Sequence, residues 1–392
     1  MSVSRLSSQF DIVSSVMQKL RLLKSISRVE LARQLSVAPS TVGIHVDRLV
    51  ELGFLRQGHR QESGSGRPAT LIELNPEAGQ FIGIDLDSRE VHGVSVDFAQ
   101  RVLRDRTVSV RSNESASNVL ELIESVIEDV RDQSRELLGI GIGVPGTVDI
   151  RKGMALHYQF IRGWRNIPLV KRLEERYLTP VHIENNIRAM AMAERWFGQG
   201  KEVENYICLG VRSGIGSGLI LNGELYRGLH HLAGEIGCWP CSLSDDGKVM
   251  PLEQVASLTA ILQKMTEGVR AGESTTLSLF RGRVTVEKMV EAVSQEDKFC
   301  CDVLGRAGEL IGQVIAQMTL MLDPQKIIIA GPITKAGDAF LSPLRHSLNK
   351  FLPAMHAKEP EVSYSELGEL VGALGAAALA VHAWEPKGSH KK

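Results

Sequence analysis

The stretch VHIENNIRAMAMAE, residues 181–194, decides the fold. Its β-branched opening predicts a strand, and the Ala- and Met-rich residues that follow predict a helix. Glu184, Asn185 and Asn186 lie at the corner between the two elements. Because α/β proteins hold small polar ligands at such corners, we expect a ligand site here. The cluster can form hydrogen bonds with a polyhydroxy ligand, but an Asn cannot take a proton from it.

The segments around this corner predict an α/β body that begins at residue 80. A β-hairpin is predicted over 81–98, and a third strand and an amphipathic helix over 118–138 follow it. Next comes a buried strand that runs into the loop GVPG. A second hairpin with a Gly-rich turn is expected over 205–226, and another buried strand over 326–331. The last helix is rich in Ala and Gly.

The first 75 residues predict a winged helix-turn-helix. Apolar residues at helical spacing indicate helices over 9–23 and 27–35, the second with Ser27 as its N-cap. A third helix is expected with Ser40 as its N-cap and with its end at Gly53. In a helix-turn-helix the second helix of the motif enters the DNA major groove. The residues expected to face bases and phosphates are Ser40, Thr41, Gly43, His45 and Arg48.

Residues 55–75 predict a β-hairpin wing with a Gly- and Ser-rich tip. Arg67 lies in this tip, where it can enter a narrow minor groove. Residues 1–70 hold 10 Lys and Arg against 5 Asp and Glu, a balance of +5, while the remainder holds 35 against 41, a balance of −6. A basic head on an acidic body favours DNA binding. The alternative is a small protein-binding helical module with a flexible linker.

The composition is that of a globular protein, with 43% hydrophobic and 23% charged residues in a chain of 392. No segment approaches the ~20 apolar residues of a membrane-spanning helix. The five cysteines are odd in number and irregularly spaced, which argues against a disulfide framework. We therefore expect a cytoplasmic protein without membrane contact.

The whole chain resembles the ROK family (repressors, open reading frames, kinases), and in particular its sugar-responsive transcriptional repressors. The resemblance implies an α/β fold in which the winged helix-turn-helix is followed by a two-lobed actin-like ATPase body of the sugar-kinase type. The expected domains are the head at 1–75, the first lobe at 80–190 and the second lobe at 191–392. The motifs that carry it are SGSGRPA, GIGVPGTVD, GWRNIPL, IENNIRAMAMAERWFGQG, RSGIGSGLILNGELYRG and HHLAGEIG.

Two departures from the family kinases argue against catalysis. Kinases of the family resemble this body but carry a glycine-containing Asp-x-Gly-Gly-Thr turn for the phosphates of ATP, whereas this chain has DLDSRE at 85–90. Asp87 and Ser88 replace the glycines, and an added carboxylate repels phosphate. Asn186 stands where the kinases have the Asp that acts as general base, and loss of such a base costs roughly 10²- to 10⁴-fold in rate. The second turn, RSGIGSG at 212–218, is retained, although a tight hairpin alone requires such glycines.

The resemblance also implies the sugar-binding residues. These are Asn185, Asn186, Glu235 and Glu253, with Gly146 and Gln159 as further candidates. Carboxylates and carboxamides supply the donors and acceptors that sugar hydroxyls need. Asn185 and Asn186 also suit a helix N-cap, and the two roles are compatible.

The zinc site of the family is altered, so we expect no cofactor. Most members follow GEIG with a His and three Cys that hold zinc. Here Cys238 replaces the His, and Ser244, Asp246 and Pro251 stand in place of the cysteines. Cys238 and Cys241 leave open a rearranged zinc site; the alternative is two partly buried thiols packed near a Trp.

The sequence thus predicts a DNA-binding transcriptional regulator, a repressor rather than an enzyme. Its expected partners are a double-stranded DNA operator, a sugar or sugar derivative as effector, and further copies of the chain in a homodimer or homotetramer. Two alternatives stay open: a sugar kinase with an accessory head, and a regulator controlled by a protein partner.

Overall fold

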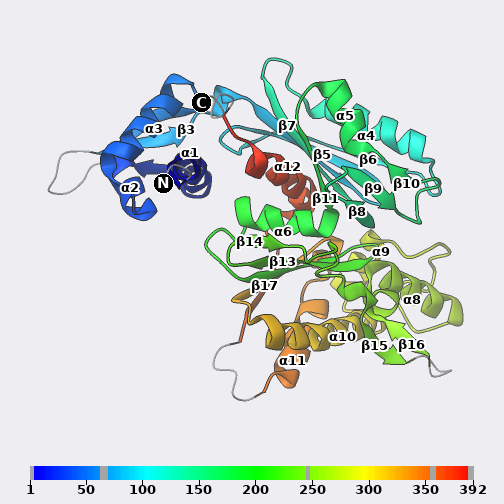
Figure 1. Ribbon diagram of the computed structural model, residues 1–392. Helices are drawn as coiled ribbons and strands as arrows, with labels where there is room; N and C mark the ends of the chain where they lie inside the picture. The colour runs from blue at the N-terminus through cyan, green and yellow to red at the C-terminus, as the bar shows by residue number, and fades with distance from the viewer. Residues whose placement is uncertain (1–3, 62–68, 244–247, 354–358, 387–392) are drawn as a thin grey trace. The chain divides into compact units, whose positions relative to one another are not determined.

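The computed structural model describes residues 4–61, 69–243, 248–353 and 359–386 (Figure 1). The chain divides into two compact units. The first comprises Met1–Glu184 and Ala376–Lys392, and the second comprises Asn185–Gly375. This division differs from the predicted lobe boundary at residues 190 and 191, and it returns the end of the chain to the first unit.

The head contains three helices and a small sheet, as the sequence predicted. The helices are α1 (Ser4–Leu23), α2 (Arg28–Leu35) and α3 (Pro39–Glu51), and the strands β1 (Ser25–Ser27), β2 (Leu55–Gln61) and β3 (Ala69–Leu74) form a sheet in the order β1-β3-β2. The core includes Leu20, Leu31 and Val46, none of which is exposed to solvent.

Two details of the head bear on its helix starts. Ser27 caps α2, because its Oγ accepts a hydrogen bond from the Glu30 amide at 3.2 Å. Ser40 does not cap α3: the N-cap is Ala38, and Pro39 occupies the first turn. The fixed φ of a proline suits the first helical position, so the helix starts earlier than predicted. The predicted minor-groove residue, Arg67, lies outside the described residues.

The first lobe is a five-stranded sheet in the order β11-β7-β4-β5-β6. Strands β4, β5 and β6 form an antiparallel meander, and β7 adds parallel to β4. Its elements are β4 (Gln80–Leu86), β5 (Glu90–Asp97), β6 (Val102–Ser109), α4 (Ala116–Val130), β7 (Leu137–Val144), β8 (Thr147–Asp149), β9 (Met154–His157), β10 (Arg165–Ile167), α5 (Leu169–Tyr177) and β11 (Val181–Asn185).

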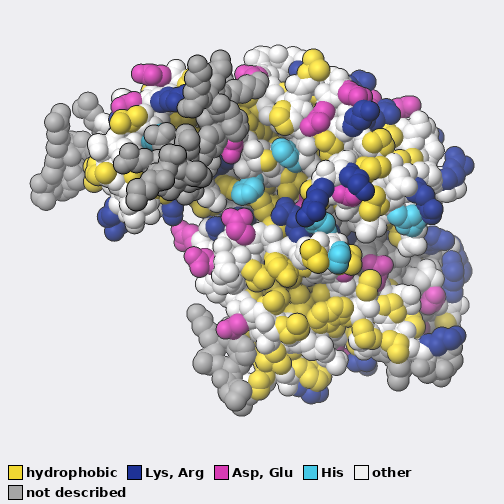
Figure 2. Space-filling view, viewed as in Figure 1, with side chains coloured by type: hydrophobic (Ala, Val, Ile, Leu, Met, Phe, Trp, Pro, Cys, Tyr) yellow, Lys and Arg dark blue, Asp and Glu magenta, His cyan; other side chains and the backbone are white. Residues whose placement is uncertain are grey.

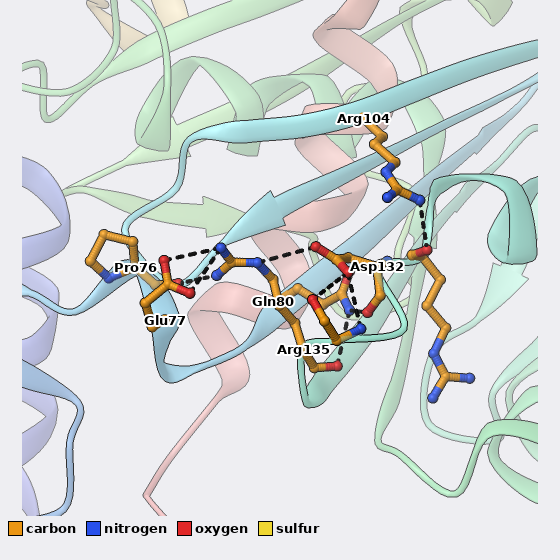
Figure 3. A network of polar contacts seen from close by, with 8 residues as sticks. Pro76, Glu77, Gln80, Arg104, Asp132 and Arg135 are labelled. Carbon is orange, nitrogen blue, oxygen red and sulfur yellow. Dashed lines mark hydrogen bonds and ion pairs between the residues drawn. The ribbon is translucent and has the colours of Figure 1, made fainter.

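Helix α4 ends at Val130, whereas the apolar periodicity predicted a helix that reaches Leu138. The next residues turn instead: Asp132 accepts hydrogen bonds from the Ser134 amide at 3.0 Å and hydroxyl at 2.6 Å. Gln80 binds both the amide and the carbonyl of Asp132 (Figure 3). Such side-chain bonds offer the backbone an alternative to the helix, and they explain the early end.

The second unit repeats the sheet pattern in the order β14-β13-β12-β17-β18. A meander of three strands is again extended by parallel strands, since β12 pairs with β17 and β17 with β18 in parallel. Its elements are α6 (Asn186–Trp196), β12 (Tyr206–Val211), β13 (Ile215–Leu221), β14 (Glu224–Tyr226), β15 (Pro240–Leu243), β16 (Val249–Pro251), α7 (Leu252–Ala256), α8 (Leu258–Ala271), α9 (Val286–Ser294), α10 (Lys298–Leu322), β17 (Lys326–Ala330), α11 (Asp338–Phe351) and β18 (Glu361–Tyr364).

The last helix, α12 (Val371–Ala383), belongs to both units. In the second unit, Gly375 lies directly against the carbonyl of Ala189 in α6. In the first unit, Ala376 lies directly against Gly141 of β7. A Cβ at either glycine would overlap backbone atoms, so the small residues of this helix are needed for close packing. In the part of the chain that the structure describes, no helix is long and apolar enough to span a membrane.

Candidate ligand site and DNA-binding head

The strand-to-helix corner has the predicted form. Strand β11 ends at Asn185, and α6 begins at Asn186. Asn185 caps α6, because its Oδ1 accepts hydrogen bonds from the amides of Ile187 at 3.0 Å and Arg188 at 3.3 Å. Both asparagines are buried. The capping role left open by the sequence is therefore present, and it fixes the Asn185 side chain at the corner.

Arg188, which the sequence analysis overlooked, ties this corner to the loop that carries Glu235. Its side chain is 3% exposed; Nη1 donates to the His231 carbonyl at 2.6 Å, and Nη2 lies 3.8 Å from Glu235 Oε1. Glu235 itself is 45% exposed. The signal in the sequence was an arginine in the first turn of a helix that is otherwise rich in Ala and Met until Glu194. A deeply buried guanidinium requires a partner, and Glu235 supplies the opposite charge.

Glu253 joins the same group from the start of α7. Its Oε2 accepts a hydrogen bond from the Ile215 amide, 3.2 Å away, at the turn between β12 and β13. Gly237, in the loop that follows Glu235, also lies against it: a Cβ there would lie 3.3 Å from Glu253 Oε2. Burial raises the pKa of Glu235, Arg188 lowers it, and Glu253 raises it again. The second unit thus links Glu235 and Glu253 to Arg188, which lies two residues after Asn186 in α6.

The other two predicted sugar-binding residues, Gly146 and Gln159, belong to the first unit. Gly146 has a φ of +75° and lies against the carbonyl of His157, where a Cβ would overlap that oxygen. Gly146 therefore serves the backbone geometry of its loop. Gln159 is exposed in the loop after β9.

The turn between β4 and β5 is shaped by its own carboxylate. Asp87 Oδ1 accepts a hydrogen bond from the Ser88 amide at 2.5 Å, and the Asp87 amide donates to Glu90 O at 2.9 Å. Phosphate-binding turns offer backbone amides of this kind to the anion. Here a carboxylate of the chain itself accepts the Ser88 amide.

The second predicted phosphate turn is a tight hairpin. Val211 pairs with Ile215, and the Arg212 amide donates to Gly214 O at 2.9 Å. The Arg212 side chain is buried and packs against Gly331, where a Cβ would lie 3.0 Å from Arg212 Cγ. None of the motif glycines Gly214, Gly216 and Gly218 has a positive φ. A Cβ at Gly214 would overlap Glu253 and one at Gly218 would overlap Ala191, so close packing rather than the turn geometry accounts for these two glycines.

The cysteine pair does not form a metal centre with other described residues. Cys238 is exposed, Cys241 is half-buried, and burial is the main cause that raises the pKa of each thiol. Among the residues that the structure describes, no group of three or more His, Cys, Asp or Glu could hold a metal. Ser244 and Asp246 lie outside the described residues. The loop is instead held by the β15–β16 pair and by a 2.9 Å bond from the Leu252 amide to Trp239 O.

Helix α3 presents the predicted DNA-binding residues on its outer side. Ser40 and Arg48 are exposed, and Thr41, Gly43 and His45 are half-buried. A Cβ at Gly43 would meet no atom within 4 Å, so this face is open. Ile44, which the sequence analysis did not select, is 69% exposed. An exposed apolar side chain on such a helix suits contact with a thymine methyl group.

The head is docked on the first lobe through the linker between β3 and β4. Asn75 donates from Nδ2 to Gly53 O at 2.7 Å, and its amide donates to Phe54 O at 2.9 Å. Arg135, in the loop after α4, donates to Pro76 O at 2.8 Å and to Glu77 Oε1 at 3.0 Å (Figure 3). The segment that follows α3 is therefore connected through this linker to the first lobe.

An aromatic cluster, which we call the junction, makes a second connection within the first unit. It comprises Phe54 of the head, Phe98 of the first lobe and Trp384 after α12, together with Arg21 of α1. The Trp384 ring lies 4.8 Å from each Phe ring in an edge-to-face arrangement, and the Arg21 guanidinium lies 5.6 Å from its centroid. Burial lowers the pKa of Arg21 to about 9. Pattern analysis could not detect these contacts between segments distant in sequence.

Comparison with known proteins supports one family. The ROK family model matches residues 81–383. The DNA-binding transcriptional dual regulator NagC of Escherichia coli is 30% identical over 90% of this chain and 88% of its own length. The xylose repressor of Caldicellulosiruptor bescii is 28% identical over 91% of this chain and 92% of its own length. A glucokinase of Halalkalibacterium halodurans is 28% identical over 75% of this chain and 93% of its own.

Solved structures agree with the fold. A ROK family transcriptional regulator described as a homologue of Mlc from E. coli superposes with a TM-score of 0.80 at 24% identity, over 96% of this chain and 97% of its own. A ROK family glucokinase of Streptomyces griseus, solved with glucose and AMPPNP, has a TM-score of 0.68 at 26% identity and covers 77% of this chain and 99% of its own. The regulator matches nearly the whole chain, and the kinase matches a smaller part. These comparisons confirm the predicted family and the predicted fold.

Proposed function

Because the chain belongs to the ROK family, we propose that it is a sugar-responsive transcriptional repressor whose kinase-like body senses its ligand without catalysis. The observation that carries the proposal is the combination of an intact helix-turn-helix head with a corner where Asn186 replaces a general base. Relatives that match over nine-tenths of this chain are named repressors or regulators, and the glucokinase matches three quarters of it.

The case against catalysis rests on two separate sites in the chain. At the corner, an amide cannot accept the proton of a sugar hydroxyl. At the turn between β4 and β5, Asp87 accepts the Ser88 amide and brings a negative charge where a phosphate would need positive or neutral groups. Restoring either function would require a different residue, so the body acts as a receptor.

For the DNA interface we propose the outer side of α3 together with the wing. Ser40, Thr41, Gly43, His45 and Arg48 would contact bases and phosphates in the major groove, and Arg67 would enter the minor groove. Two heads in an oligomer would read a roughly palindromic operator.

Self-association is supported by an apolar surface on the second unit. Figure 2 shows hydrophobic side chains gathered over the region where Figure 1 places β13, β14 and α10. Tyr226 of β14 is 51% exposed, and Leu320 and Met321 of α10 are 54% and 75% exposed. Gathered apolar side chains on a protein surface mark interaction sites, and we propose that a second copy of the chain covers those that Figure 2 shows.

For the effector site we propose Asn185, Asn186, Glu235 and Glu253 of the second unit. The other two residues predicted from the sequence, Gly146 and Gln159, belong to the first unit. The chain passes between the units at Glu184–Asn185 and at Gly375–Ala376. The first passage coincides with the corner, and α12 continues from the second passage to Trp384 in the junction. A ligand that prefers one arrangement of the units would shift the population of that arrangement and with it the DNA affinity of the head.

The direct test is selection of bound fragments from a genomic DNA library, followed by elution with a panel of sugars. The expected result is a palindromic sequence that one sugar releases, and that the Arg48→Ala variant retains more weakly. Specific DNA that no sugar releases would contradict sugar sensing and favour control by a protein partner. Absence of specific DNA, together with sustained sugar-dependent ATP consumption in a coupled assay, would favour the kinase alternative.

A further inference from the structure

The charges at the corner of the second unit are unequal. Two carboxylates, Glu235 and Glu253, and one guanidinium, Arg188, meet there. The charged side chains that act on the Glu235 carboxyl are Arg188, which stabilises its anion, and Glu253, which opposes it. The group as a whole therefore carries one net negative charge when both carboxylates are ionised.

Among the described residues, the guanidinium that acts on Glu235 is that of Arg188, and two of its nitrogens contact the protein. Arg188 is 3% exposed; one of its nitrogens donates to the His231 carbonyl at 2.6 Å, and another faces Glu235 at 3.8 Å. It therefore holds Glu235 in place and cannot turn outward to a ligand anion without losing both contacts. Arg212 in the neighbouring hairpin packs against Gly331.

The surface offered to a ligand is acidic, because the two carboxylates are exposed and Arg188 is buried. The Glu235 side chain is 45% exposed, and Glu253 is exposed while its Oε2 accepts the Ile215 amide. Ionised carboxylates only accept hydrogen bonds, which suits the hydroxyl groups of a sugar. A phosphate group is also an acceptor and is anionic, so it would find neither a donor nor an opposite charge in these two side chains.

We propose that the effector is an uncharged sugar, and that Glu235 and Glu253, with Arg188 buried and bound to the His231 carbonyl, exclude phosphorylated sugars from the site. This inference rests on the proposed sugar-sensing function and narrows it to one class of ligand. Like charges that approach within a few ångströms repel one another by about 1 kcal/mol each even in water. We expect an uncharged sugar to bind at least about tenfold more tightly than its phosphate ester.

The test is isothermal titration calorimetry of the full-length protein with pairs of a free sugar and its phosphate ester. The probes are pentoses, hexoses and N-acetylhexosamines, each beside its terminal phosphate ester. The expected result is binding of a free sugar and at least tenfold weaker binding of its ester. Glu235→Gln and Glu253→Gln should each reduce that ratio severalfold, because each removes one repelling charge while keeping the shape of the side chain.

Two controls separate this selectivity from a general effect on folding. Glu224→Gln removes an exposed carboxylate from β14 and should leave the ratio unchanged. Arg188→Met should weaken binding of both forms, because Glu235 loses its anchor, whereas Arg188→Lys should restore part of the affinity through its charge.

The results separate selectivity for uncharged sugars from sugar sensing as such. A phosphate ester that binds as tightly as its free sugar, or more tightly, would overturn the inference and leave the sensor function standing. A ratio that Glu235→Gln and Glu253→Gln do not change would equally overturn it. Binding of neither form would remove the sugar-sensing function itself, and the inference with it.

Discussion

Replacing Trp384 with alanine should loosen the head from the first lobe without unfolding either part. The Trp384 ring makes two edge-to-face contacts at 4.8 Å, with Phe54 and Phe98, and Arg21 lies 5.6 Å from its centroid. Each aromatic pair contributes roughly 0.5–1.5 kcal/mol. The cation–π contact contributes roughly 0.5–1 kcal/mol. Together these contacts place the loss of docking free energy at roughly 1.5–4 kcal/mol.

Amide hydrogen exchange beside the junction measures this loss of free energy. The Asn75 amide donates to Phe54 O at 2.9 Å within the head, directly beside the junction, and reports local opening of the head at Phe54. Since about 1.4 kcal/mol corresponds to a factor of ten, this amide should exchange roughly 10- to 700-fold faster in Trp384→Ala. The amide of Ile207, central in the sheet of the second unit, should keep its rate. Trp384→Phe retains a ring at this position and should show a smaller change.

A matched control is Phe351→Ala on α11, which removes an aromatic ring that is 46% exposed and lies outside the junction. It should leave exchange at Asn75 unchanged. If Trp384→Ala also left that rate unchanged, the junction would contribute nothing to docking. An equal acceleration at Ile207 would show that the variant weakens the whole chain, and the reasoning about a local connection would fail.

Further predictions concern the DNA interface, the corner and one buried carboxylate. Arg48→Ala should weaken operator binding and reduce the magnitude of the slope of log K against log salt by about 1, which fluorescence polarisation at several salt concentrations measures. Arg67→Ala should weaken operator binding without shifting the thermal unfolding midpoint of the protein. Asn186→Asp restores a carboxylate, yet a coupled ATPase assay should show no sustained turnover, because the β4–β5 turn is unchanged. Asp297 is the N-cap of α10, and burial would raise the pKa of its carboxyl. Hydrogen bonds from the amides of Cys300 and Thr276 and from the Thr275 hydroxyl outweigh burial and lower this pKa from 3.8 to about 2. Its stabilisation should therefore be complete above about pH 4 and be lost as the pH falls through 2, and Asp297→Ala should cost roughly 1–2 kcal/mol in urea unfolding at neutral pH.

The elements that the sequence predicted well are those set by local patterns. The corner at Asn185, the helices of the head and the two hairpins follow from apolar periodicity, β-branched runs and turn glycines. The errors lie where a side chain competes with the pattern. Apolar periodicity continues to Leu138, but the side chains of Asp132 and Gln80 bind backbone amides and end α4 at Val130.

The parts of the candidate site that the sequence missed depend on contacts between distant segments. The ion pair of Arg188 with Glu235 joins α6 to a loop more than forty positions away, and nothing in the periodicity of α6 indicates it. The junction likewise joins Phe54, Phe98 and Trp384. Such contacts are set by tertiary packing, which a single sequence does not reveal through local propensity.

The physical distinction between a kinase and a sensor lies in which groups of a binding site are lost. At the corner, Asn186 removes a proton acceptor but keeps a donor and an acceptor for a hydroxyl group. At the β4–β5 turn, Asp87 takes a backbone amide and adds a negative charge. Neither change touches Glu235 or Glu253, whose carboxylates remain directed by Arg188 and by the Ile215 amide. Binding energy that a kinase would use to stabilise a transition state is then available to favour one arrangement of the chain over another, which is what a regulator requires.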